Sequence, residues 1–354
     1  MNGITSILPS DTVAQAMAAQ MKRKVATPRR GARTITLSAG GVDLHVRLRV
    51  APGADRLLVT FHGGVDRARA TLPVFNGFID DLPGTHQLSV SDPSLGCDSA
   101  LRLAWHAGHE GFDTPAVLRA VIAATIQQLK VVRTAFFGTS GGGFAALVQS
   151  HAVPGSIVVV ANPQTAIERY HPRQVASYRA ACWPELPPEV PLDSVTVADC
   201  ARLYAGGFDN TVIYALSLGD GHHMRHHMLP FVAAIAHLPA AQRLLLHTDY
   251  DGNAGHHMAR SHYLPWLRAA LTATDTAPAS LLTMWHSLRD APLRPLRPGR
   301  RRPAPVSPPF APSDLAAGER VAAWLAGTAR ESSVPNHNPI PSAPTLPVLR
   351  KEHA

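Results

Sequence analysis

The sequence predicts an α/β fold in which a mostly parallel central sheet is flanked by helices. Short apolar segments, such as residues 157–161 and 211–217, alternate with longer segments that have helical periodicity, such as 114–129. Strands buried on both faces of a parallel sheet give continuous apolar runs, whereas helices repeat their apolar face every 3.6 residues. With 354 residues, 45% of them hydrophobic, the chain is long enough for one large domain of this class and additional segments.

Three parts of the chain are expected from its composition. Residues 1–33 should form an N-terminal helix, peripheral to the fold, and a basic linker. Residues 34–274 should form the α/β domain, with an irregular insert at about 166–210 that acts as a cap. Residues 275–354 are rich in arginine and proline and should be a largely disordered tail.

Apolar periodicity and turn residues predict the order of the elements within the domain. The predicted strands are 34–37, 42–50, 57–61, 87–90, 131–137, 157–161, 211–217 and 244–247. The first two should form a hairpin through Gly40 and Gly41. Helices are predicted at 114–129, after the turn at 138–143, from about 222, and at about 258–272 with a break near Pro265.

Charge and cysteine content exclude several classes of protein. The formal charge is +8, but much of it lies in the terminal segments without interleaved aromatic residues, so no nucleic-acid partner is expected. No apolar run approaches 18 residues, and the N-terminal segment lacks the apolar core of a signal peptide; a cytoplasmic location is expected. The three widely spaced cysteines favour neither a disulfide framework nor a zinc knuckle.

The most informative stretch is 135–147, which indicates a buried strand, a sharp turn and the start of a helix. The turn contains Gly-x-Ser-x-Gly with Ser140 at its tip, the pattern of the nucleophile elbow in α/β-hydrolases. Glycines are needed there because strand and helix approach closely around a strained serine. A purely structural glycine turn is the alternative. The flanking strand and helix favour Ser140 as a nucleophile in an α/β-hydrolase fold.

His62-Gly63-Gly64 follows directly after the strand at 57–61. In α/β-hydrolases, the loop after the third strand supplies one backbone N–H of the oxyanion hole, and the residue after the nucleophile supplies another. The predicted donors are therefore Gly63, Gly64 and Gly141. The alternative is a plain turn from strand to loop.

An acid and a base follow in the chain order that this fold requires. Asp220 follows the strand at 211–217, and His256 follows the last predicted strand. This gives the order Ser…Asp…His, with Asp220 orienting the imidazole and His256 acting as general base. Asp249 and Asp251 are alternative acids, and His257 is the alternative base.

The histidines between 222 and 227 form two pairs with i,i+4 spacing, His222/His226 and His223/His227, and such pairs can bind zinc. No glutamate stands between them as in His-Glu-x-x-His, and the sequence offers no obvious third ligand. We expect these side chains to pack beneath the acid, and we expect neither a metal nor another cofactor.

The assembled motifs resemble a bacterial group of serine hydrolases. They are the elbow at 137–147, Asn-Pro-Gln-Thr at 162–165, Asp220 with His223, His227 and Pro230-Phe231, and Gly255-His256. Over roughly residues 35–272 the chain is similar to the accessory Sec system glycan O-acetyltransferases, whose group accompanies surface-glycan loci. The resemblance implies a serine-dependent acyl-transfer enzyme acting on an ester, in particular on a glycan.

The sequence thus predicts a serine esterase or glycan O-acyltransferase that uses an acyl-enzyme intermediate and a small-molecule or glycan ester. Two alternatives remain. One is a non-catalytic binding module of the same fold for surface-glycan assembly, and the other is a zinc-dependent hydrolase built on the histidine cluster. The intact serine, aspartate and histidine argue against a binding module.

Overall fold

The computed structural model describes residues 10–26, 31–80, 82, 84–250 and 255–289. The chain divides into two units, residues 1–309 and 310–354, and every described residue belongs to the first unit. Asp251 and the predicted tail from residue 290 onward lie outside the described residues.

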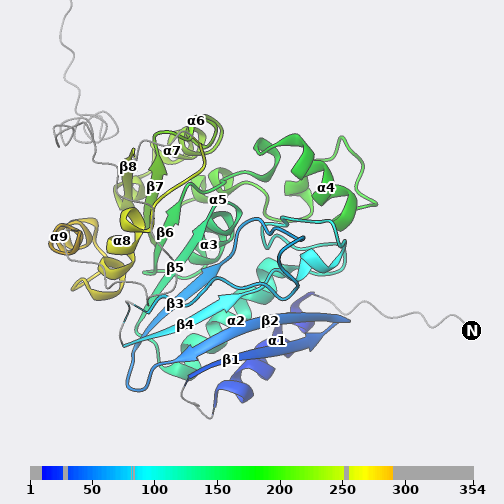
Figure 1. Ribbon diagram of the computed structural model, residues 1–354, viewed down its shortest axis with the longest axis horizontal. Helices are drawn as coiled ribbons and strands as arrows, with labels where there is room; N and C mark the ends of the chain where they lie inside the picture. Colours follow the sequence, from blue (N-terminus) through cyan, green and yellow to red (C-terminus); the bar gives the residue numbers. More distant parts are fainter. Residues whose placement is uncertain (1–9, 27–30, 81, 83, 251–254, 290–354) are drawn as a thin grey trace, which may run out of the picture. The chain divides into compact units, whose positions relative to one another are not determined.

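A single eight-stranded sheet organises the described part of the chain, in the order β1-β2-β4-β3-β5-β6-β7-β8 (Figure 1). The hairpin β1–β2 is antiparallel, β2 pairs antiparallel with β4, and the other five pairings are parallel. The strands are β1 Gly31–Ala39, β2 Val42–Val50, β3 Arg56–Phe61, β4 Thr85–Val90, β5 Arg133–Thr139, β6 Ile157–Ala161, β7 Thr211–Ser217 and β8 Leu244–Asp249. The predicted α/β-hydrolase fold is confirmed, and every predicted strand is present.

Helices cover both faces of the sheet (Figure 1). They are α1 Ser10–Val25, α2 Thr114–Leu129, α3 Gly141–His151, α4 Pro172–Cys182, α5 Cys200–Ala205, α6 Gly221–His223, α7 Leu229–Ile235, α8 Arg260–Thr272 and α9 Pro278–Leu288. A π-helical turn, Met224–Met228, joins α6 to α7. Pro265 lies inside α8, so the break expected there does not occur.

Two hydrophobic clusters separate the faces of the sheet. In β3, Leu57 and Val59 belong to the cluster that includes side chains of α1, α2, α3 and α7. Leu58, which points the other way, belongs to the cluster formed with α8 and α9. This alternation follows from the two-residue period of a strand, and it explains why buried parallel strands are apolar at consecutive positions.

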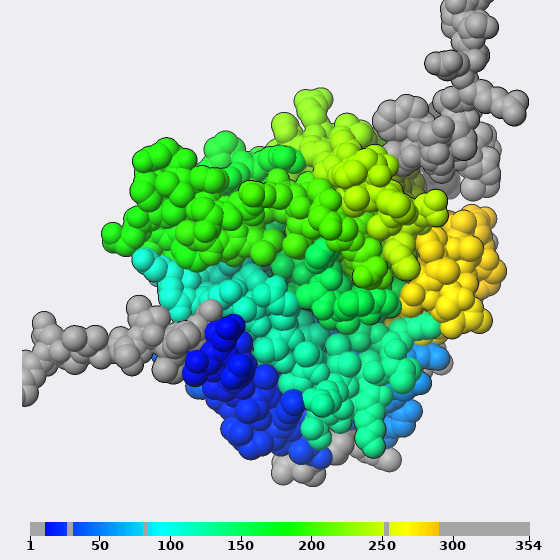
Figure 2. All heavy atoms as spheres, turned by 180° about the vertical axis from the view of Figure 1, so that it is seen from behind, coloured from blue at the N-terminus to red at the C-terminus, as the bar shows by residue number. Residues whose placement is uncertain are grey.

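The N-terminal helix α1 is part of the core, which corrects the expected peripheral appendage. Its Met17 and Met21 are fully buried, and the helix packs against α2 and β1. Figure 2 shows the blue α1 lying directly on the teal surface of α2. The apolar face was recognised in the sequence, but a short amphipathic helix does not reveal which surface covers that face.

Helix α9 forms an ordered element beyond residue 275, inside the segment where the sequence predicts a largely disordered tail. Leu281 is fully buried, and the Trp285 ring stacks on Trp266 of α8 with centroids 4.8 Å apart. Pro278 occupies the first helical turn, where a missing N–H has no cost. The i,i+4 pair of Leu281 and Trp285 was the missed signal for an amphipathic helix.

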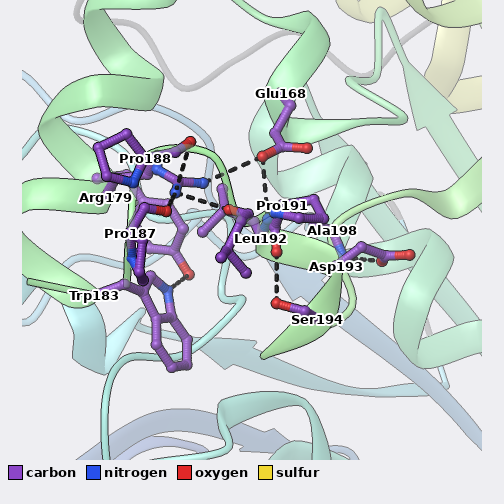
Figure 3. Close-up of polar contacts among 12 residues, drawn as sticks. Glu168, Arg179, Trp183, Pro187, Pro188, Pro191, Leu192, Asp193, Ser194 and Ala198 are labelled. Carbon is purple, nitrogen blue, oxygen red and sulfur yellow. Dashed lines mark hydrogen bonds and ion pairs between the residues drawn. The ribbon is translucent and has the colours of Figure 1, made fainter. Parts of the chain in front are cut away.

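The insert at 166–210 contains the short helices α4 and α5 and is held by polar contacts (Figure 3). Arg179 donates to the carbonyl oxygens of Pro187 and Val190, at 2.8 Å each, and to Glu168 Oε1 at 3.3 Å. The same Glu168 oxygen accepts from the N–H of Leu192 at 3.0 Å. A single arginine therefore fixes the proline-rich part of the insert.

Within the described residues, no helix has the length and apolar character needed to cross a bilayer.

Candidate active site

Ser140 lies at the tip of a tight turn between β5 and α3. Its backbone has φ 55° and ψ −126°, a conformation that an L-residue adopts only when its surroundings impose it. A Cβ at Gly138 would lie 2.0 Å from the Gly142 oxygen, and one at Gly142 would lie 2.3 Å from the Phe61 oxygen. The flanking glycines are thus required sterically, as the sequence predicts for a nucleophile elbow.

The Ser140 hydroxyl accepts a hydrogen bond from the side-chain amide of Gln164, with Nε2 2.9 Å from Oγ. Gln164 follows β6 and is completely buried. Within the described residues, no hydrogen bond joins Ser140 to His256. The motif at 162–165 was noted in the sequence, but no pattern there shows that Gln164 contacts the serine.

Asp220, after the end of β7, binds two histidines. Its Oδ2 lies 2.6 Å from Nδ1 of His256, and its Oδ1 lies 3.0 Å from both the backbone N and the Nδ1 of His223. The two imidazoles stack, with centroids 4.1 Å apart and 22° between their planes. The structure therefore brings together the predicted acid and base, and adds His223, which the sequence suggested only as one member of a histidine cluster.

Electrostatics keep the Asp220 carboxyl ionised although its side chain is only 4% exposed. Burial by itself raises its pKa, but hydrogen bonds from His223 and His256 outweigh burial and hold the pKa of Asp220 well below its usual value. Burial lowers the pKa of His223, so this imidazole is neutral near pH 7. The negative charge of Asp220 is thus available to orient the His256 ring.

The alternative acids and base have other positions. Asp249, the last residue of β8, lies 3.3 Å from Nε2 of His262, not next to His256. Asp251 lies outside the described residues. His257 is exposed and lines the same cavity as His256. Among the described residues, the imidazoles that hydrogen-bond to Asp220 are those of His223 and His256.

An open cavity of about 800 Å³ connects the candidate residues. Ser140, after β5, and His256, after β8, both line it, and the loop of His62, Gly63 and Gly64 lines it as well. A Cβ at Gly63 would lie 3.0 Å from the Thr139 oxygen, so this loop runs directly beside the elbow. Gly141 is the first residue of α3, and its N–H has no partner within the helix. Gly63 and Gly141, two of the predicted oxyanion donors, therefore lie next to Ser140.

The histidines between 222 and 227 have different partners outside their own cluster. His227 is buried, and its Nδ1 accepts from the backbone N–H of Thr165 at 3.2 Å, while His222 stacks on His171. In the part of the chain that the structure describes, the group of three able to hold a metal is instead Asp220, His223 and His256, whose ligand atoms lie within 4.8 Å of one another. The contacts within this group have hydrogen-bond lengths, and an ion there would replace them.

A second buried network supports the glycine loop, and the sequence did not reveal it. Asp92 Oδ2 accepts from the backbone N–H of His106 at 2.7 Å, and the Asp92 N–H donates to Nε2 of His62 at 3.1 Å. Burial lowers the pKa of His62 and of His106 to about 4. Both imidazoles are therefore neutral in the folded protein at pH 7, and His62 serves as a fixed acceptor beside Gly63.

These buried imidazoles predict loss of stability in mild acid. Burial also lowers the pKa of His247, in β8, to about 4. The unfolded chain takes up these protons near pH 6.5 and the folded chain only near pH 4, so stability is present above pH 6.5 and is lost as the pH falls toward 4. Each group should contribute up to about 1.4 kcal/mol per pH unit. Urea unfolding followed between pH 7 and pH 4.5 measures this slope.

The matched variant is His247→Phe, which removes one of these groups far from the cavity. It should reduce the pH slope by up to about 1.4 kcal/mol per unit. A free energy of unfolding that stays constant from pH 7 to pH 5 would contradict the prediction.

No family model matches the chain, and no curated protein matches it in sequence. Among solved structures, it is similar to the capsule O-acetyltransferase of Neisseria meningitidis serogroup A, with 16% identity, a TM-score of 0.45, and coverage of 62% of this chain and 89% of that one. It is also similar to acetyl xylan esterase 1 from Thermoanaerobacterium sp. JW/SL YS485, with 12% identity, a TM-score of 0.42, and coverage of 72% of this chain and 95% of that one. A third similar structure is the acylaminoacyl peptidase of Pyrococcus horikoshii, with 12% identity, a TM-score of 0.44, and coverage of 67% of this chain and 39% of that one.

Proposed function

We propose that the protein is a serine-dependent acyl-transfer enzyme with Ser140 as nucleophile, His256 as general base and Asp220 as the orienting acid. One observation carries this proposal. Asp220 lies 2.6 Å from Nδ1 of a histidine whose ring lines the same cavity as a serine at the tip of a nucleophile elbow. A carboxylate that accepts from Nδ1–H leaves Nε2 unprotonated, and Nε2 is then the atom that can take a proton.

The chemistry has two steps. His256 Nε2 takes the proton of the Ser140 hydroxyl while Oγ attacks the ester carbonyl, and the proton then passes to the leaving alcohol. Water or a sugar hydroxyl, deprotonated by His256, next attacks the acyl carbon; the bond to Ser140 Oγ breaks, and His256 returns the proton to Oγ. The N–H groups of Gly141 and of the Gly63-Gly64 loop would stabilise the oxyanion in both steps. The side chain of His256 is 40% exposed, so the ring can turn toward the serine when a substrate enters.

The cavity suits an ester that carries several hydroxyl groups. Its lining combines the rings of Tyr170 and Tyr263 with the polar side chains of Asp66, Arg102 and Gln174. Aromatic faces and hydrogen-bonding groups together match the two kinds of surface on a sugar ring. We therefore favour a glycan ester or glycan acceptor, in line with the resemblance seen in the sequence.

Labelling with a fluorophosphonate probe tests the proposal without knowledge of the substrate. The probe reacts with an activated serine, so the purified protein should be labelled on Ser140, as identified by peptide mass spectrometry. Absence of labelling on Ser140 would favour the alternative, a non-catalytic binding module of the same fold.

A chelator should leave activity unchanged. A zinc-dependent hydrolase is the second candidate, because Asp220, His223 and His256 together can hold a metal. If His256 deprotonates Ser140, no ion is needed, and incubation with EDTA should change neither the rate of labelling nor ester hydrolysis. Loss of activity in EDTA that added zinc restores would move the assignment to the metal enzyme.

A further inference from the structure

The side-chain amide of Gln164 has a fixed orientation. Its Oε1 accepts a hydrogen bond from the indole N–H of Trp105, and its Nε2 lies 2.9 Å from Ser140 Oγ. An indole nitrogen can only donate, so the amide oxygen must face Trp105 and the NH₂ group must face the serine.

The segment that holds Trp105 adopts an unfavourable backbone conformation. Trp105 and His106 have φ 54° and φ 53°, in the left-handed region that bulky residues rarely adopt. Both are buried, and the backbone N–H of His106 is held by Asp92 at 2.7 Å. Two adjacent strained residues persist only where other contacts impose them, and here the strain directs one indole N–H at Gln164.

We propose that Gln164 is a catalytic residue that donates a hydrogen bond to the nucleophile oxygen itself, and that Trp105 is a positioning residue that holds the amide in that orientation. The inference rests on the proposed function, because it concerns the charge that develops on Ser140. It goes beyond that function, since neither residue belongs to the serine, histidine and aspartate set or to the oxyanion hole.

The physical argument concerns where negative charge appears. When His256 removes the hydroxyl proton, charge develops on Oγ before the bond to the acyl carbon is complete. The same oxygen is the leaving group when the acyl-enzyme breaks down. A neutral donor that is buried, already oriented and 2.9 Å away stabilises that charge in both steps without having to reorganise. Removing one such donor typically costs about 10²-fold to 10³-fold in rate.

The network also links the nucleophile to the loop of the oxyanion hole. Asp92 contacts His62, which precedes Gly63, and it holds His106, the neighbour of Trp105. The amide of Gln164 then connects Trp105 to Ser140. Two sets of hydrogen bonds, one at Asp92 and one at Gln164, are thus joined through the backbone of Trp105 and His106, and together they hold Ser140 and the loop of Gly63.

The test is the kinetics of fluorophosphonate labelling in three variants, with the maximal rate constant and the probe affinity measured separately. Gln164→Met, which has no donor, should lower the maximal rate constant by about 10² with unchanged probe affinity. Gln164→Glu keeps an acceptor for Trp105 but points a second carboxylate oxygen at Ser140, so it should be slower still. Trp105→Phe removes the orienting N–H together with part of the buried ring and should cost about fivefold, since one net hydrogen bond contributes about 1 kcal/mol.

The control is Gln149→Met, the same change at a buried glutamine in α3 that donates to the Pro115 oxygen, away from the cavity. It should be labelled at the wild-type rate. A merely structural role for Gln164 would lower the fraction of molecules that become labelled and leave the rate of that fraction unchanged, so the final extent of labelling separates the two roles.

Failure of the inference and failure of the proposed function give different results. If wild-type Ser140 is not labelled, the proposed function is wrong. If the wild type is labelled and Gln164→Met reacts equally fast or faster per active molecule, the serine enzyme stands and the role of Gln164 is overturned. Thermal unfolding of each variant confirms that folded protein is compared, and Trp105→Phe and the isosteric Gln164→Glu keep the test informative if Gln164→Met does not fold.

Discussion

Ser140→Ala is expected to lower ester turnover by about 10⁶, to the level left by the oxyanion donors and substrate binding alone. The alanine has no atom that can form the acyl-enzyme, and neither Gly141 nor His256 can replace it. Water would have to act as the nucleophile in a cavity arranged around the serine oxygen. The turnover number with a small ester and covalent labelling by a fluorophosphonate both measure the loss, and labelling should disappear completely.

The fold should tolerate this change. Ser140 loses one side-chain hydrogen bond, from Gln164, which corresponds to about 1 kcal/mol in the free energy of unfolding. Ser287→Ala in the exposed part of α9 is the matched control and should keep full activity. Residual turnover in Ser140→Ala above about a hundredth of the wild-type value would end the serine-nucleophile assignment, since a lost nucleophile costs far more than this.

The tight turn at Ser140 and the proximity of Asp220 and His256 could be predicted from the sequence, because each follows from a simple rule. Gly138 and Gly142 are sterically required around Ser140, so a Gly-x-Ser-x-Gly sequence between a strand and a helix indicates this tight turn. The carboxyl ends of parallel strands meet at one edge of the sheet, so Asp220 after β7 and His256 after β8 had to lie near each other. Both inferences need only the element order, which periodicity predicts well.

The contacts of Gln164 were not accessible in the same way. Trp105, Ser140 and Gln164 lie on three different loops, and the hydrogen bonds between them depend on loop conformations that no periodic pattern encodes. The positive φ values at Trp105 and His106 contradict the preference of these residue types. Residue preferences therefore do not predict the backbone conformation of Trp105 and His106, because contacts with the rest of the fold impose it.

His223 shows a third situation, in which the residue was noticed but its role was not. Its spacing from His227 suggested a metal-binding helix face. In the structure it stacks on His256 and shares Asp220, because Asp220 caps the short helix α6 and brings the third residue of that helix back onto its own carboxylate. Capping explains the position of His223, whose Nδ1 lies 3.0 Å from Oδ1 and 2.9 Å from Oδ2 of Asp220. Only the path of the chain after β8 brings His256 to Oδ2.

Asp220→Asn is expected to lower turnover by about 10⁴ with little effect on folding. Oδ1 accepts from the backbone N–H of His223, and this capping bond will keep the amide oxygen at that position. The new NH₂ group then replaces Oδ2, which lies 2.6 Å from Nδ1 of His256. A donor at this point forces Nδ1 to accept and places the ring proton on Nε2, so the imidazole can no longer take a proton from Ser140.

The control for the acid assignment is Asp249→Asn, the same isosteric change at an aspartate that faces His262. Because its carboxylate does not contact His256, this variant should keep turnover within about threefold of the wild type, an effect below about 0.7 kcal/mol. Comparing the two variants by kcat with one ester, and by urea unfolding, separates loss of the correct tautomer from loss of structure. If Asp249→Asn shows the large loss and Asp220→Asn the small one, the acid is Asp249 at the end of β8, and Asp220 serves only to hold His223. The fall should appear in kcat and not in KM, since Asp220 is buried behind the imidazole and acts on the ring proton.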